Sequence, residues 1–236
     1  MNDSEILDKI KNKLIISVQS AKNEPLNNEI AMNALIDTVI LLGKIDVLRL
    51  AGVRDIKNTK EKYKDNVVVI GITKPDIIPV NYKEIVYITP ALTDAKSLIE
   101  AGADIIALDS TKRKRPNNES LKTIIDFIHS KNKLVMADIS TFDEAEYAFN
   151  LGADIISTTL SGYTKETENN PETPDFKLVE KCKKELNCPV ILEGKIKDES
   201  DVKKAFESGA YAVVIGSMVT RPHKIIENFK KGLING

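Results

Sequence analysis

A short module that ends a helix with glycine and then enters an apolar strand occurs three times, and it limits the possible folds more than any other feature. The copies read Glu-Ala-Gly-Ala-Asp-Ile-Ile from Glu100, Asn-Leu-Gly-Ala-Asp-Ile-Ile from Asn150 and Glu-Ser-Gly-Ala-Tyr-Ala-Val from Glu207. Glycine after a helix permits the left-handed turn that caps it, and a short apolar run bounded by turns indicates a strand buried on both faces. Divergent sequence separates the copies, which argues against a solenoid and favours repeated βα units around a parallel sheet.

The rest of the chain alternates between strand-like and helical segments in the order that such units require. We expect strands at 14–19, 46–50, 67–73, 105–109, 134–138, 155–159, 190–193 and 212–216. We expect helices at 3–12, 28–42, 59–63, 93–101, 118–130, 142–151, 174–186, 199–208 and 222–232. Eight such units in 236 residues predict one (β/α)8 TIM barrel of the phosphate-binding type, which commonly takes about 250 residues.

Two segments need separate interpretation. Residues 1–12 are predicted to form an N-terminal capping helix, so that the whole chain, 1–236, is a single barrel domain. The run 85–89 also resembles a strand, but Pro75 and Pro79 leave no room for a crossover helix before it. We therefore interpret 75–92 as an insertion after the third strand.

Composition excludes several classes of partner and places the chain in the cytoplasm. A formal net charge of −1 argues against nucleic acid or an anionic membrane as the main partner. No apolar run approaches the roughly 20 residues that span a bilayer, and the N-terminus is acidic and polar, unlike a signal peptide. Cys182 and Cys188 lack metal-ligand spacing and are interpreted as reduced thiols.

The seventh and eighth strands each end in glycine, which is a pattern of phosphate-binding barrels. Gly194 follows the first of them, and Gly216 and Ser217 follow the second. Backbone N–H groups in such loops bind anions, so we expect a phosphate there, assisted by Lys195 and Arg221. The alternative is that both glycines only form turns.

Polar groups stand at nearly all of the expected strand ends, where barrel enzymes carry their active sites. They are Gln19, Arg49, Lys74, Asp109, Asp138, Thr158, Thr159, Glu193 and Ser217. The third and seventh strands lie opposite each other in a ring of eight, which predicts Lys74 as a general base facing Glu193 as a general acid. Arg49 on the adjacent strand, together with apolar neighbours, would lower the pKa of the lysine.

No metal site is expected. The two histidines, His129 and His223, fall in predicted helices away from the strand ends. An Mg²⁺ ion held by Asp109 and Asp138 remains an alternative, as does a purely structural role for Asp109. The basic run 112–115 is interpreted as a solvated helix entrance, with a phosphate or a second subunit as the alternative that it would face.

The chain resembles the N-acetylmannosamine-6-phosphate 2-epimerase family in stretches that cover most of its length. They are 14–20, 24–26, 108–116, 136–141, 157–164, 193–194 and 220–222. The resemblance implies a phosphate-binding barrel, usually a homodimer, that interconverts N-acetylmannosamine 6-phosphate and N-acetylglucosamine 6-phosphate in sialic acid catabolism without a cofactor. It implies catalytic roles for Lys74 and Glu193, and substrate binding by Gln19, Arg49 and Asp138. Tyr163, inside the matching 157–164 block, is expected to bind substrate as well.

The chain departs from the family pattern at four positions near the expected site. Asn27 replaces histidine, Pro75 and Lys195 replace arginine, and Ser217 replaces glycine. The fold does not depend on these positions, but the choice of sugar does. Two alternatives therefore stay open, namely another phosphosugar isomerase or lyase, and a phosphosugar-binding protein without activity.

Overall fold

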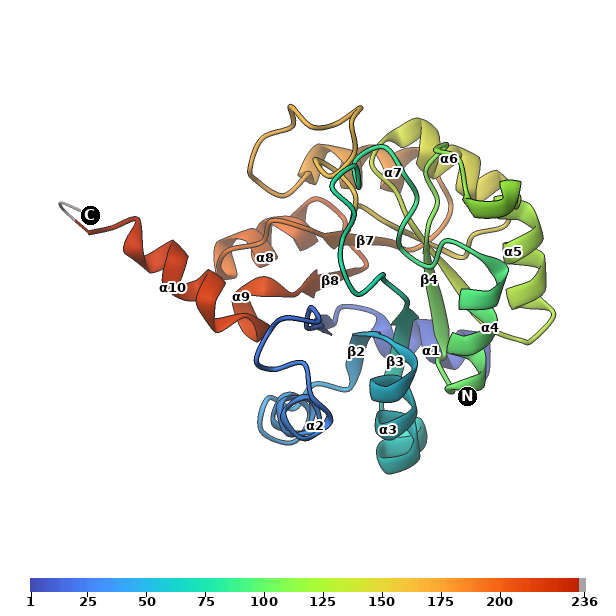
Figure 1. Ribbon diagram of the computed structural model, residues 1–236. Coiled ribbons are helices and arrows are strands. Elements are labelled where there is room, and N and C mark those ends of the chain that lie inside the picture. The colour runs from blue at the N-terminus through green and yellow to red at the C-terminus, as the bar shows by residue number, and fades with distance from the viewer. Residues whose placement is uncertain (234–236) are drawn as a thin grey trace.

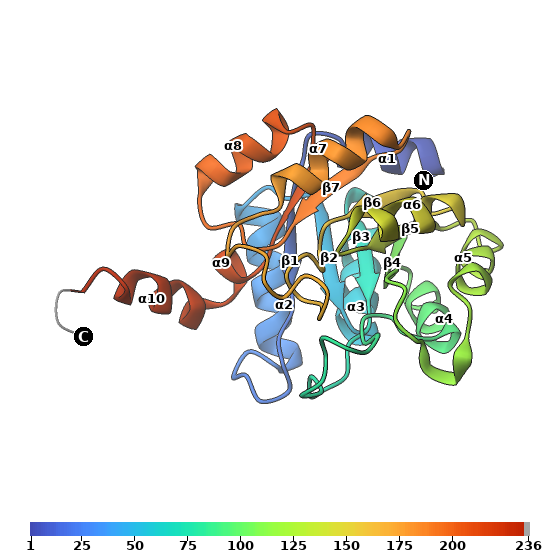
Figure 2. The same ribbon diagram turned by 90° about the horizontal axis from the view of Figure 1, so that it is seen from above.

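Eight parallel strands close into a barrel in chain order in the computed structural model, which describes residues 1–233 (Figures 1 and 2). The strands are β1 Leu14–Val18, β2 Val47–Ala51, β3 Val68–Ile72, β4 Ile105–Asp109, β5 Leu134–Asp138, β6 Ile155–Ser157, β7 Val190–Glu193 and β8 Ala212–Ile215. Pairing of β8 with β1 closes the ring. The predicted (β/α)8 fold is confirmed, and β3 and β7 lie on opposite sides of it.

Helices cover the outside of the barrel. They are α2 Glu29–Asp37, α3 Val53–Tyr63, α4 Leu92–Glu100, α5 Leu121–His129, α6 Phe142–Asn150, α7 Phe176–Glu185, α8 Glu199–Glu207, α9 Ser217–Thr220 and α10 Pro222–Lys230. Their apolar faces pack on the outward-pointing strand residues and form one continuous core. Several helices begin at side-chain caps, for example Ser120 before α5 and Thr141 before α6, where a hydroxyl accepts an orphan backbone N–H.

Strand residues alternate between the barrel interior and the helix layer. On β5, for instance, Met136 points into the barrel and Ala137 packs under the helices. Helix α1, Asp3–Ile10, closes the amino end of the barrel, where Ile6 and Ile10 are buried in the interior cluster. The Tyr211 hydroxyl donates to the Leu7 carbonyl at 3.0 Å and fixes that helix in place.

Three local predictions need correction. Helix α3 begins at Val53 and not near Thr59, because Gly52 adopts φ +96° and turns the chain into the helix directly after β2. The helix expected over 28–42 ends in a π-helical turn, Thr38–Leu42. The short helix α9 was not predicted, and it separates β8 from α10.

The segment between β3 and α4 contains no helix and returns to the sheet. The Thr89 amide donates to the Thr73 carbonyl at 3.0 Å, and the Asp109 amide donates to the Ile88 carbonyl at 3.1 Å. The strand-like part of this insertion thus lies between the carboxyl ends of β3 and β4, above the level where those strands pair directly. It narrows the mouth of the barrel without becoming a ninth strand.

Helix α10 extends away from the barrel, as both views show (Figures 1 and 2). It has no buried residue, and Ile226 and Phe229 are 53% and 76% exposed. Within residues 1–233, no helix has the length and apolar character needed to cross a bilayer.

Candidate active site

A cavity of about 450 Å³ opens at the carboxyl ends of the strands. It brings together most of the residues that the sequence predicted for the site. The predicted residues in its wall are Gln19, Lys74, Tyr163, Glu193, Gly194, Lys195, Gly216, Ser217 and Arg221. Of the predicted site residues, Arg49 and Asp138 do not line it; they lie buried beneath the wall.

Arg49 and Asp138 form a buried ion pair below the cavity. Both Nη atoms of Arg49 reach Asp138, at 3.1 Å to Oδ1 and 2.6 Å to Oδ2, which is the bidentate geometry that suits arginine and carboxylate. Burial opposes the charged guanidinium, but the charges of Asp138 and Glu193 raise the pKa of Arg49 above its ordinary value. The guanidinium of Arg49 therefore keeps its proton.

Glu193 ends β7 and connects this ion pair to the cavity. Its Oε2 lies 3.4 Å from Arg49 Nη1 and accepts a hydrogen bond from the Thr159 hydroxyl at 3.1 Å. Thr159 Oγ1 is also 2.7 Å from Asp138 Oδ1. Burial and the nearby Asp138 charge raise the pKa of Glu193 even though Arg49 and Lys74 oppose the shift. A raised pKa favours the protonated form of this carboxyl group, which is the form that can donate a proton.

Lys74 follows β3 and enters the cavity from the opposite side of the ring. Its Nζ donates to Gln19 Oε1 at 2.7 Å, and Gln19 Nε2 in turn donates to Ser17 Oγ at 2.5 Å. Solvent in the cavity reaches the side chain, but the surrounding protein atoms still desolvate the amine. That burial, together with the positive charge of Arg49, lowers the pKa of Lys74 to about 8. A substantial fraction of this amine is neutral at physiological pH.

The loops after β7 and β8 form the other end of the cavity. Gly194 adopts φ +110°, a conformation that glycine tolerates, and lets its backbone turn along the cavity wall. Gly216 precedes α9, where the amides of Val219 and Thr220 donate to the Gly216 carbonyl and those of Ser217 and Met218, at the start of the helix, have no backbone acceptor within the described residues. Arg221 Nε lies 3.9 Å from Glu24 Oε1, and its side chain lines the same end.

Lys195 lines the cavity, but its amine contacts the long loop between β6 and α7. Its Nζ donates to the Pro171 carbonyl at 2.8 Å and lies 3.9 Å from Glu172 Oε1. The amine also sits over the Tyr163 ring, 5.7 Å from the ring centroid. In this arrangement Lys195 holds that loop beside the cavity.

Sequence reasoning missed Tyr87 and Ser17, which both line the cavity. Burial and the Asp109 charge raise the pKa of the Tyr87 phenol to about 12. Tyr87 lies in the insertion after β3, whose path cannot be read from local sequence. Ser17 precedes Gln19 by two residues and so shares its face of β1, a spacing that could have indicated it.

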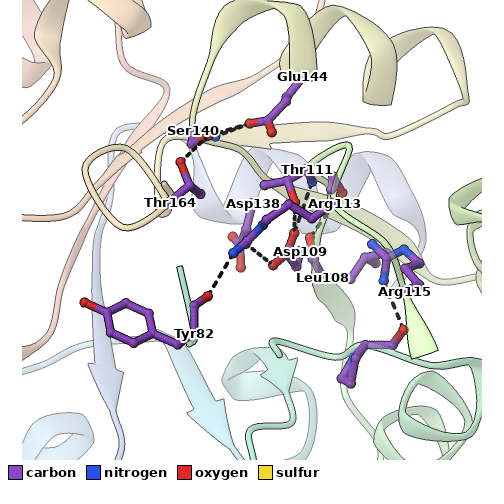
Figure 3. A network of polar contacts seen from close by, with 12 residues as sticks. Tyr82, Leu108, Asp109, Thr111, Arg113, Arg115, Asp138, Ser140, Glu144 and Thr164 are labelled. Atoms are coloured by element: carbon purple, nitrogen blue, oxygen red, sulfur yellow. Dashed lines mark hydrogen bonds and ion pairs between the residues drawn. The ribbon is translucent and has the colours of Figure 1, made fainter. Parts of the chain in front are cut away.

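Asp109 and the basic run do not reach the cavity. Asp109 is fully buried at the end of β4 and accepts from Thr111 and Arg113, as Figure 3 shows. Arg115 is 6% exposed and donates to the Pro90 carbonyl at 3.2 Å. Two of the four residues in the run 112–115 are therefore largely buried, which corrects the interpretation of the run as a solvated helix entrance.

The fold and this site define a barrel enzyme whose reactive groups project from the carboxyl ends of its strands. Residues 32–235 match the family described as "Putative N-acetylmannosamine-6-phosphate epimerase". The chain belongs to this family of isomerases.

Individual relatives agree with the family match. A protein of Clostridioides difficile (strain 630) named "Putative N-acetylmannosamine-6-phosphate 2-epimerase" is 43% identical over 97% of this chain and 99% of its own length. The solved structure of the N-acetylmannosamine-6-phosphate 2-epimerase from Clostridium perfringens superposes with a TM-score of 0.88 at 40% identity, covering 97% of this chain and 96% of that one. The 3-hexulose-6-phosphate synthase of Salmonella typhimurium shares only the fold, at 17% identity and a TM-score of 0.61 over 93% and 95% of the two chains.

Proposed function

We propose that this protein interconverts N-acetylmannosamine 6-phosphate and N-acetylglucosamine 6-phosphate by proton transfer at C2, in the catabolism of amino sugars such as sialic acid. One observation carries the mechanism. Two groups from opposite sides of the barrel, Lys74 and Glu193, line one cavity with pKa values displaced toward their neutral forms. Family membership supports the choice of substrate.

The two groups suffice for the chemistry without a cofactor. Ring opening places an aldehyde at C1, which makes the C2 proton acidic. Lys74 takes this proton, and the electron pair of the C2–H bond forms the C1–C2 double bond of an enolate, whose negative charge rests on the former aldehyde oxygen. Glu193, on the opposite side, gives its proton to C2 from the other face, so that the configuration at C2 is inverted. Proton exchange with water then restores both groups.

The contacts of Lys74 support its role as the base. Its hydrogen bond to Gln19 orients the amine, and Arg49 keeps a positive charge nearby that disfavours the protonated form. When a sugar fills the cavity, it displaces water and desolvates the amine further. This further favours the neutral amine of Lys74, which is the form that can accept the C2 proton.

Polar groups around the pair are proposed to position the sugar. Arg49 and Asp138 lie buried beneath the cavity wall, so their proposed contacts with the sugar require the side chains above them to shift. Arg49 Nε has no hydrogen-bond partner within the described residues and is the donor that this shift would expose. Asp138 and Gln19 supply acceptors on the same side, and Tyr163, 36% exposed, supplies a ring and a hydroxyl at the opening.

We assign the phosphate to the loops after β7 and β8. Amides near Gly194, Gly216 and Ser217 would donate to it, with Arg221 and Lys195 as cations. Lysine binds a phosphate as a point charge and lacks the fork of arginine. Substrate anchored there places C2 toward the barrel axis, between the proposed base and acid.

We further propose that the protein is a cytoplasmic homodimer that uses a phosphosugar and neither nucleic acid nor membrane. The exposed apolar side chains of α10, Ile226 and Phe229, support an association of two copies. The near-neutral formal charge of −1 supports the absence of polyanionic partners.

A direct assay tests the proposed reaction. The purified protein is incubated with each of the two phosphosugars, and the C2 configuration of the products is followed by NMR. We expect the same equilibrium mixture from either starting sugar, with no reaction in Lys74→Ala. Turnover of a different phosphosugar alone would identify another isomerase or lyase. Binding without turnover of any of them would identify a binding protein.

A further inference from the structure

The basic run 112–115 contains a side chain that the chemistry described above does not use. Arg113 is 14% exposed and follows β4, on the side of the barrel away from the phosphate loops. We propose that Arg113 is a positioning residue that holds the insertion 75–92 over the barrel mouth. It thereby fixes the part of the cavity wall that contains Tyr87. This inference rests on the proposed function only for its kinetic readout.

Each nitrogen of the Arg113 guanidinium has a different partner. Nε donates to Thr111 Oγ1 at 2.9 Å, Nη2 to Asp109 Oδ2 at 2.6 Å, and Nη1 to the Tyr82 carbonyl at 2.9 Å (Figure 3). The first two contacts fix the guanidinium to the end of β4. The third extends from this fixed point to the insertion, 31 residues earlier in the chain.

Tyr82 transmits the constraint to the cavity. Its ring meets the Tyr87 ring edge to face, with 6.0 Å between the centroids. Tyr87 lines the cavity together with Ile88, whose carbonyl accepts from the Asp109 amide at 3.1 Å. Asp109 thus takes part in two of the contacts that hold the insertion, one through its own amide and one through Arg113.

A neighbouring contact connects the insertion to the long loop between β6 and α7. The Lys165 amide donates to the Lys83 carbonyl at 3.0 Å, and Lys83 Nζ lies 3.5 Å from Glu168 Oε2. Because Lys83 directly follows Tyr82, the contact from Arg113 steadies this junction as well. The loop it steadies carries Tyr163, which lines the same cavity as Tyr87.

Lysine cannot replace this arginine. One ammonium group can keep an ion pair with Asp109, but it has no planar fork to reach Thr111 and the Tyr82 carbonyl at the same time. Arg113→Lys therefore retains the positive charge next to the buried Asp109 and removes the contact to the insertion. Tyr82→Ala is the complementary change, since it keeps the ion pair and removes the ring that supports Tyr87.

The experiment measures hydrogen exchange of the amides in 76–88 together with kcat/KM and the affinity for inorganic phosphate. In Arg113→Lys we expect faster hydrogen exchange confined to the amides of 76–88. We also expect kcat/KM to fall by about tenfold to hundredfold, because a small displacement of the residues that position the substrate has an effect of this size. Phosphate affinity should stay within about twofold of wild type, because the phosphate loops lie across the barrel. Tyr82→Ala should lower kcat/KM likewise, and Tyr82→Phe should restore it. Lys114→Ala, an exposed change in the same run, is the matched control and should behave as wild type.

The outcomes separate this inference from the proposed function. Unchanged exchange in 76–88 for Arg113→Lys overturns the inference, as does faster exchange without a change in kcat/KM. Faster exchange across the whole barrel would show a general structural role and also overturns it. If wild-type protein does not turn over the proposed sugars, the proposed function fails, while local exchange and the kinetics of whichever phosphosugar reacts still decide the role of Arg113.

Discussion

Asp109 and Asp138 occupy equivalent positions on adjacent strands and have different roles. They are register partners at the ends of β4 and β5, both are fully buried, and both pair with an arginine. The partner of Asp138 is Arg49, which stands on β2 and connects the pair to Glu193 in the cavity. The partner of Asp109 is Arg113, four residues further along, which contacts the insertion.

The difference shows that the role of a buried carboxylate depends on where its arginine partner lies and on what else that arginine contacts. Burial costs both aspartates a similar desolvation penalty, which each offsets with a charge-assisted pair. Only the Asp138 pair is connected to the proposed acid, and it sets the charge environment of Glu193 and Lys74. In the Asp109 pair, Arg113 lies away from the cavity and contacts the insertion 75–92.

The largest effect is expected from Lys74→Ala, which removes the proposed base from the cavity. Proton transfer by a positioned base typically contributes about 10²–10⁴-fold, so kcat should fall by at least that range. Affinity for inorganic phosphate, measured by calorimetry, should stay near that of wild type. Full activity in this variant would place the base elsewhere.

Replacing Asp109 and Asp138 separately with asparagine tests whether the two ion pairs have different roles. We expect Asp138→Asn to lower kcat by about 10²–10³-fold, as the loss of a preorganised charged group does in other sites. Asp109→Asn should act through the insertion and lower kcat/KM by about tenfold or less. Steady-state kinetics of both purified variants decide the order. Equal losses would mean that the two clusters are not functionally distinct.

The pH profile of Glu193→Gln sharpens the assignment of acid and base. Wild-type kcat/KM should be bell-shaped, because activity needs neutral Lys74 and protonated Glu193. Glutamine neither titrates nor donates a proton to C2, so kcat/KM should fall sharply. The residual activity, in which water supplies the C2 proton, should keep only the lysine limb, rising with pH and levelling off. The midpoint should lie at or below about 8, since the Glu193 charge that raises the pKa of Lys74 is gone. A profile that still falls above this midpoint would assign the acid to another group.

The smallest effect is expected from removal of divalent metal. The proposed mechanism uses only Lys74 and Glu193 for proton transfer, so prolonged chelation should leave kcat within about twofold of its starting value. The control is chelated enzyme supplied again with Mg²⁺ or Mn²⁺. Activity that is lost and then restored by either ion would assign a metal to Asp109 or Asp138.

The sequence predicted the parts of this site that depend on the strand order. The alternation of strand-like and helical segments, supported by three helix–glycine–strand modules, predicts eight strands, and a ring of eight places the third strand, with Lys74, opposite the seventh, with Glu193. The strand order also predicted that the loops after β7 and β8 lie at the site. The phosphate assignment and the individual roles of the site residues remain predictions.

What the sequence did not show depends on contacts between distant segments. The insertion has no periodic pattern of its own, so neither its return between β3 and β4 nor Tyr87 in the cavity wall was predicted. Arg113 and Arg115 looked solvated because four basic residues in a row usually are, and only the buried Asp109 and the carbonyls of the insertion explain their burial. Two equivalent aspartates cannot be told apart until their partners are known.

Isotope exchange at C2 tests the central claim that Lys74 and Glu193 transfer protons at this carbon. Wild-type enzyme converts N-acetylmannosamine 6-phosphate in D₂O, and NMR follows deuterium in the product, with Lys74→Ala and the surface control Lys114→Ala alongside. The account predicts one solvent deuterium at C2 of the product for wild type and the control, and neither product nor exchange for Lys74→Ala. Epimerised product that retains the original C2 hydrogen would contradict it.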